Sequence, residues 1–245
     1  MNVIIRGLSR EYRDARLDGR PRSATPPARP ELVNRYVEVS LRDRSGMATN
    51  TESVDLVGDE AATNLARAAL FAALVGAFAY VSFPNPLSAG VPITLQVLGV
   101  FLAGIMLGPV WGSLSMVLYL AAGAVGAPVF SGGTAGLSYL IASPTLGFLW
   151  SYPFAAAVIG LVAHRGTSLS DVDAVPTPVL VGAMVVGTAI IYGFGTVGFA
   201  VIQYDPWYAS LWQAFVVSSL AFVPVEAVKI AAAVGIVKND AIAAA

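Results

Sequence analysis

The run VPVEAVKI, residues 223–230, holds a glutamate and a lysine three residues apart among apolar residues. In a helix these two side chains, Glu226 and Lys229, share one face and can form an ion pair. A charge at the centre of a bilayer costs about 2.5–3.5 kcal/mol on insertion scales, and by default it marks a functional site. Lys229 lies roughly 13 Å along a helix from Lys238, too far to snorkel to the membrane surface. The pair is therefore either a structural ion pair or a polar ligand site. The free-energy cost of burying charges in the membrane favours the ligand site.

Two more polar side chains, Thr94 and Gln96, lie at the start of the apolar stretch 91–107. A threonine in a membrane helix can bond its own backbone, so Thr94 alone does not indicate a ligand. The amide of Gln96 needs partners for its donors and its acceptor. Gln96 therefore either joins two helices or contacts a ligand.

A glycine-rich segment, SGGTAG, occupies residues 131–136. It is not a phosphate-binding loop, because such a loop needs a lysine after its glycines and a helix behind a strand. Two interpretations remain open. The segment is a flexible outer loop, or it is a lid in which backbone N–H groups and the hydroxyls of Ser131 and Thr134 contact a ligand.

Catalytic and metal-binding sets are absent from the sequence. The chain has one histidine and no cysteine, which excludes thiol nucleophiles and the common zinc sites. His164 stands beside Arg165 at a helix end, where we expect a solvated interface residue. The segment GLSYL, residues 136–140, has no histidine nearby that could activate its serine. We predict no enzyme activity, no catalytic residue, no cofactor and no metal site.

The composition is that of a membrane protein. Hydrophobic residues make up 56% of the 245 residues and charged residues only 12%, against about 25% in soluble domains. Residues 68–164 contain no Asp, Glu, Lys or Arg. A soluble fold of that length could not cover its surface.

Six apolar stretches are long enough to be membrane helices, which need roughly 17–25 residues. They are separated by turn-rich breaks and cover residues 64–83, 91–107, 110–126, 144–163, 178–202 and 208–237. Little more than Gly108 and Pro109 separates the second from the third, which predicts a tight helical hairpin. The sequence thus predicts an all-α integral membrane protein with six transmembrane helices.

The basic residues give an orientation. Arg67, Arg165 and Lys238 lie next to the first, fourth and sixth helices, so an even number of crossings separates each pair. All three then fall on one side, and the positive-inside rule places that side, with both termini, in the cytoplasm.

The N-terminal segment differs from the rest. Residues 1–60 are rich in Arg and Pro and lack an apolar run, so we expect a disordered arm before a membrane domain at 61–245. Met47 opens a plausible start, and we expect residues 1–46 to be upstream sequence that is not native. A targeting arm or a nucleic-acid-binding tail is the alternative, and no nucleic-acid partner is predicted.

The first helix carries a row of small residues, Ala69, Ala73 and Ala77, at a spacing of four. Such a row lets another helix approach closely. It serves either internal packing or a partner protein.

Taken together, the motifs PITLQ, GGTAG, SPTLGF and PVEAVK closely resemble those of the BioY family, and the resemblance covers about residues 64–238. Members of that family are the biotin-binding substrate (S) components of energy-coupling factor (ECF) transporters. The resemblance implies a six-helix S-component fold that captures biotin at the outer face, for uptake across the cell membrane. It implies as partners the lipid bilayer, a transmembrane coupling (T) protein and two ABC ATPase subunits. The alanine row would then dock the coupling protein.

In that family an acid and a lysine of the sixth helix engage the ureido head of biotin, and Glu226 and Lys229 match them. A ureido ring offers one carbonyl acceptor and two N–H donors, which this pair can satisfy. The rest of biotin needs apolar walls, which Phe130, Phe148, Trp150 and Tyr192 could provide. The substrate-binding residues that we predict are Thr94, Gln96, Ser131, Gly132, Gly133, Thr134, Tyr192, Glu226 and Lys229.

The chain departs from the family pattern at two places. Val225 and Glu226 replace the usual Gly-Asp, so the carboxylate is one methylene longer. Some members carry an arginine for the biotin carboxylate where this chain has Thr134. Without it, that carboxylate must rely on hydroxyls, backbone N–H groups or water, and we expect weaker recognition.

Two other functions compete with this one. A secondary transporter driven by an ion gradient would use Glu226 as its coupling carboxylate and would transport without partners. A structural membrane scaffold would bind no ligand.

Overall fold

A computed structural model describes residues 58–85 and 91–239, which belong to one compact unit, residues 56–245. The predictions for residues 1–57 lie outside the described residues. The first helix, α3 (Asp59–Tyr80), begins just inside the segment predicted as an arm.

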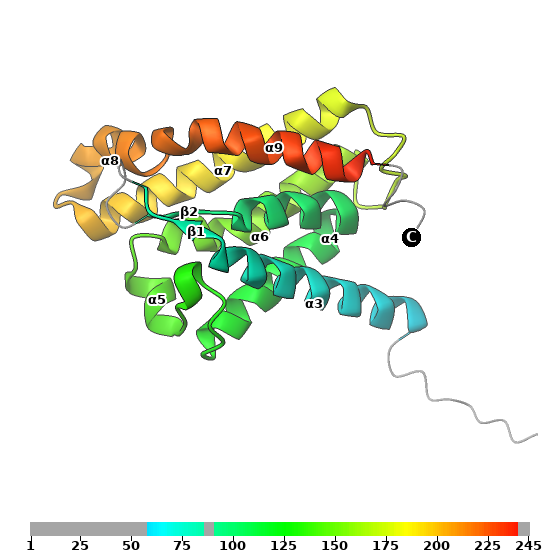
Figure 1. Cartoon of the computed structure of the whole chain (residues 1–245), viewed down its shortest axis with the longest axis horizontal. Coiled ribbons are helices and arrows are strands. Elements are labelled where there is room, and N and C mark those ends of the chain that lie inside the picture. The colour runs from blue at the N-terminus through cyan, green and yellow to red at the C-terminus, as the bar shows by residue number, and fades with distance from the viewer. Residues whose placement is uncertain (1–57, 86–90, 240–245) are drawn as a thin grey trace, which may run out of the picture. The chain divides into compact units, whose positions relative to one another are not determined.

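Five helical stretches within the described residues are long and apolar enough to cross a membrane. The first four are α3, α4 (Gln96–Ala124), α6 (Leu146–His164) and α7 (Thr177–Gln203). The fifth, Trp207–Val237, comprises η2 (Trp207–Ser210), α8 (Leu211–Ser218), η3 (Leu220–Phe222) and α9 (Val223–Val237). In Figure 1, α4 lies between α3 and α6, and α9 runs alongside α7.

Helix α4 is two helices joined by a sharp bend. Gly108 has φ 73° and ψ −175°, a conformation open almost only to glycine, and Pro109 follows it. A side chain built on Gly112 would place its Cβ 2.7 Å from the carbonyl oxygen of Ala103, so the two halves lie against each other. The predicted hairpin is therefore confirmed, and the five stretches give the six apolar helical segments expected of this fold.

Residues 91–95 are not helical, which corrects the predicted start of the second helix. Strand β2 (Ile93–Thr94) pairs antiparallel with β1 (Ser82–Phe83). Pro92 restricts Val91 to extended conformations, and the pairing of Ile93 and Thr94 with β1 continues the extended backbone as far as Thr94. Thr94 thus lies on a strand, with its side chain buried.

The sixth predicted helix, 208–237, is also wrong as a continuous element. It breaks at Ser219, whose φ of −125° and ψ of −50° are not helical, and α9 begins four residues later. Pro224 accounts for the break, since proline is tolerated in the first turn of a helix but not in its interior. The backbone of Ser219 is satisfied locally, because its N–H donates to the carbonyl of Phe215 at 2.9 Å and its carbonyl accepts from the N–H of Phe222 at 3.0 Å. Its buried hydroxyl lies 2.9 Å from that of Thr196 on α7.

A short helix that was not predicted, α5 (Leu137–Ala142), follows the glycine-rich segment. The indole N–H of Trp150 on α6 donates to the carbonyl of Leu140 on α5 at 2.9 Å. This bond holds α5 against the start of α6.

The buried core is formed by α4, α6 and α7, with α6 in the middle. The crossing of α6 and α7 is close, because a Cβ built on Gly198 would lie 2.7 Å from the Cα of Gly147. Helix α3 is the least buried of the apolar stretches. Its alanine row is exposed at all three positions, Ala69, Ala73 and Ala77.

His164 is buried, which corrects the expectation of a solvated residue. The N–H of Ser170 donates to its Nδ1 at 3.0 Å, so Nε2 carries the proton and donates to the carbonyl of Ile105 at 2.7 Å. In a regular helix that carbonyl would accept from residue 109, which is a proline without an N–H. His164 thus stabilises the bend of α4.

Lys238, just after α9, fixes the loop between α6 and α7. Its ammonium donates to the carbonyls of Val172, Asp173 and Val175 at 3.1, 2.7 and 2.7 Å. A single side chain therefore joins the end of α9 to this loop.

We expect Lys238→Met to destabilise the protein by about 1–2 kcal/mol, because three carbonyls lose a charged donor at a partly solvated site. For a domain of this size that lowers the melting temperature by roughly 2–8 °C, measurable in detergent by intrinsic fluorescence. Arg67→Met, at an exposed basic residue of α3, is the matched control and should melt like the wild type. Equal melting of both variants would contradict the role given to Lys238.

Candidate functional site

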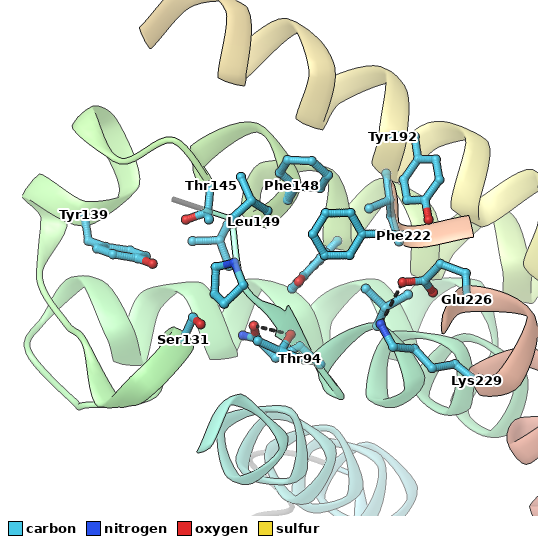
Figure 2. A pocket seen from close by; sticks show the side chains of 16 residues that line it. Thr94, Ser131, Tyr139, Thr145, Phe148, Leu149, Tyr192, Phe222, Glu226 and Lys229 are labelled. Carbon is cyan, nitrogen blue, oxygen red and sulfur yellow. Dashed lines mark hydrogen bonds and ion pairs between the residues drawn. The ribbon is translucent and has the colours of Figure 1, made fainter. Parts of the chain in front are cut away.

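A cavity lies between the start of α4, the first half of α6, the middle of α7, and α9 (Figure 2). The empty space within it, counted out into the solvent at its open mouth, is about 520 Å³. Its lining is mostly apolar, with polar groups at both ends. The lining residues are Val91, Pro92, Thr94, Gln96, Val97, Ser131, Tyr139, Thr145, Phe148, Leu149, Tyr152, Ile191, Tyr192, Phe222, Glu226 and Lys229.

Glu226 and Lys229 form the charged end of the cavity. The ammonium nitrogen of Lys229 lies 2.7 Å from Oε1 of Glu226, and the two residues are only 3% and 4% exposed. Glu226 lies in the first turn of α9, where the helix dipole favours a negative charge. The break at Ser219 creates that helix start, so the interruption of the sixth helix helps to hold the carboxylate.

Two buried oxygen atoms at this end have no hydrogen-bond partner among the described residues. They are Oε2 of Glu226 and the hydroxyl of Tyr192. Figure 2 shows the Tyr192 hydroxyl turned toward Glu226. Buried polar atoms in native proteins are rarely left unpaired, so these two oxygen atoms indicate a polar partner beyond the described residues, such as a ligand or a water molecule.

Gln96 is largely satisfied within the protein. Its Oε1 accepts from the Thr94 hydroxyl at 3.0 Å, and its Nε2 donates to the hydroxyl of Tyr119. Tyr119 lies on the second half of α4, so Gln96 joins the two halves of the hairpin. Gln96 thus joins two helices, and it can also contact a ligand, because it lines the cavity and its amide keeps one N–H free to donate.

The glycine-rich segment reaches the cavity only at its first residue. Ser131, in η1 (Ser131–Gly133), lines the cavity, whereas Gly132, Gly133 and Thr134 are outside the lining set. Thr134 is exposed, and its hydroxyl donates to the carbonyl of Ser131 at 3.0 Å. Six of the nine predicted substrate-binding residues therefore line one cavity: Thr94, Gln96, Ser131, Tyr192, Glu226 and Lys229. The other three, Gly132, Gly133 and Thr134, lie outside its lining.

Of the four expected apolar walls, Phe148 and Tyr192 line the cavity. Phe130 lies behind it, fully buried, with its ring stacked 5.4 Å from that of Tyr139. Trp150 is 44% exposed and is not part of the lining. The prediction that Phe130 and Trp150 line the cavity is therefore wrong. Phe130 packs behind the lining residue Tyr139, and Trp150 lies outside the lining.

Sequence reasoning did not select several lining residues, among them Tyr139, Thr145, Tyr152 and Phe222. The motif SPTLGF could have indicated Thr145. This threonine directly precedes α6, and the start of α6 lies at the cavity together with Gln96, the first residue of α4. No group of three or more His, Cys, Asp or Glu within the described ranges could hold a metal ion.

A sequence model described as that of the BioY family matches residues 47–244. The chain belongs to the BioY family. Among its relatives, "Biotin transporter BioY" of Rhodobacter capsulatus is 38% identical over 174 residues, covering 68% of this chain and 87% of that protein. "Biotin transporter BioY" of Rhizobium etli is 36% identical over 170 residues, covering 68% and 86%. Both names are those of transporters, which agrees with the predicted lack of enzyme activity.

The fold is that of a solved structure, the S-component for biotin from an ECF-type ABC transporter. The TM-score is 0.61 at 24% sequence identity, over 75% of this chain and 93% of that one. The prediction of an all-α, multi-pass protein of the cell membrane with the S-component fold is confirmed. The cytoplasmic location of both termini stays a prediction.

Proposed function

We propose that this BioY-family chain captures biotin for uptake, as the substrate-specific component of an ECF-type transporter. The observation that carries the proposal is the buried Glu226–Lys229 pair at the end of an apolar cavity, with one carboxylate oxygen unpartnered among the described residues. A purely structural ion pair has no need of a free, buried oxygen facing a cavity.

The pair and the ureido ring have complementary hydrogen-bonding groups. Lys229 uses one of its three donors on Glu226 and has others for the ureido carbonyl oxygen. The free Oε2 of Glu226 can accept from one ureido N–H. The Tyr192 hydroxyl, also unpartnered among the described residues, is in position to bond the same head group. Because all these groups are buried, each such bond is charge-assisted or shielded from water, which strengthens it.

The remainder of biotin matches the rest of the cavity. Phe148, Leu149 and Phe222 lie between the two polar ends in Figure 2 and offer apolar contacts to the thiophane ring and the valeryl chain. The valerate carboxylate would then lie at the end that carries Ser131 and Tyr139.

Energy for uptake must come from other subunits, because the sequence has no Walker motif. We infer a transmembrane coupling protein and two ABC ATPase subunits as partners. The exposed alanine row of α3 is the surface that we assign to the coupling protein, since small residues let two membrane helices approach closely.

We expect Ala73→Trp to reduce biotin uptake in cells more than tenfold without changing biotin binding to the purified chain, because the indole blocks close helix approach. Ala189→Trp, at an exposed alanine of α7, is the matched control and should leave uptake unchanged. Uptake by the chain alone, abolished by an uncoupler and unaffected by Ala73→Trp, would instead support the secondary transporter.

A further inference from the structure

The cavity has two chemically different ends, and only one of them is charged. Opposite Glu226 and Lys229 lie three hydroxyl groups, those of Ser131, Tyr139 and Thr145, which come from η1, α5 and the residue before α6 (Figure 2). Ser131 and Tyr139 are half-buried, whereas the charged pair is fully enclosed. The hydroxyl end is therefore the one that reaches the mouth of the cavity.

Within residues 58–85 and 91–239, which the structure describes, no cation serves the hydroxyl end. Residues 68–164, which supply all three hydroxyls, contain no Lys or Arg, and Lys229 is the one Lys or Arg between residues 166 and 237. Lys229 lies at the opposite end and is already bonded to Glu226. A ligand tail at the mouth thus meets neutral groups from the chain and water.

Hydroxyl groups do not distinguish a carboxylate from a neutral tail. Each can donate to a carboxylate oxygen or to an amide or ester carbonyl, and each can accept from an amide N–H. The hydroxyls of Ser131 and Thr145 lie 3.4 and 2.9 Å from those of Ser82 and Ser143, and each can still donate or accept a further bond. Tyr139 also lines the cavity, so its hydroxyl can make any of these bonds to a ligand tail. Because the mouth is open, a charged tail also keeps part of its hydration, and its charge adds little cost.

We infer that the site recognises its ligand by the cyclic urea and accepts tails without regard to their charge. The substrate class then comprises biotin and its neutral tail derivatives, such as amides and esters of the valerate carboxyl. This inference rests on the proposed function, since it takes biotin as the ligand. It adds that the carboxylate is not a determinant of selection.

The test is isothermal titration of the purified full chain with biotin, biotin amide and biotin methyl ester. We expect dissociation constants within about threefold of one another. An amide that binds more than tenfold more weakly than the acid would overturn the inference while leaving biotin capture intact. Binding of none of the three would overturn the proposed function itself, and the inference with it.

A second test introduces a cation at the mouth of the cavity and measures the ratio of the affinities for the acid and the amide. Ser131→Lys places an ammonium group at the mouth and should make the chain prefer the acid over the amide by more than tenfold. Ser131→Gln, of similar length but neutral, is the control and should leave the ratio near one. An acid-to-amide ratio already above ten in Ser131→Gln would show that another group reads the carboxylate and would contradict the inference.

Discussion

Glu226→Ala and Lys229→Ala are each expected to weaken biotin binding more than tenfold. The reason is that either change removes a charged partner of the ureido ring and also leaves the other charge buried and unpaired. Loss of one partner of a buried ion pair costs about 3–5 kcal/mol of stability, so these variants will also melt at lower temperature. Titration calorimetry on the purified variants measures the first effect, and a thermal melt measures the second.

The double variant Glu226→Gln/Lys229→Met separates a ligand site from a structural ion pair. It removes both charges with little change of shape, and such replacements often leave stability unchanged or raise it. We expect a melting temperature near that of the wild type together with biotin binding that stays more than tenfold weaker. Wild-type affinity in a stable double variant would show that the pair only holds α9 in place.

Gly112→Leu is expected to have the second large effect, on the fold that forms the cavity. The new Cβ would lie 2.7 Å from the carbonyl of Ala103 and force apart the halves of α4. Overpacking of this kind costs about 1–3 kcal/mol, or roughly 2–12 °C in melting temperature. Biotin binding should fall as well, because Gln96 at the cavity and Tyr119 across the hairpin are joined by a hydrogen bond.

The matched control for this prediction is Gly182→Leu on α7, where a Cβ would meet nothing within 4 Å. It makes the same chemical change on an open face and should leave both melting temperature and binding unchanged. If Gly112→Leu also behaved like the wild type, the close contact within the α4 hairpin would be contradicted.

Local chemistry explains what the sequence could predict. The hairpin follows from Gly108 and Pro109, which no continuous helix accommodates, and the ion pair follows from a spacing of three on one helix. In each case the residues that decide the structure are neighbours along the chain.

The cavity could not be predicted in the same way, because its walls come from eight separate helices and strands. Tyr152 and Phe222 look like ordinary core residues in an apolar helix, and only packing shows that they face a cavity. The break at Ser219 was missed because Pro224 fits either a kinked helix or a new helix start, and Thr196 on α7 helps to decide between them. Thr94 lies on a strand because it pairs with Ser82 on β1, a partner that the hydrophobicity of residues 91–107 does not reveal.

The central claim is that the buried Glu226–Lys229 pair binds the head of biotin. Its most direct test is calorimetric titration of the purified wild-type chain with biotin, beside thiamine and riboflavin as vitamins without a cyclic urea of this kind. The structure predicts saturable binding of one biotin per chain and no measurable binding of the other two. Absence of biotin binding, with tight binding of another vitamin, would contradict the assignment of this site.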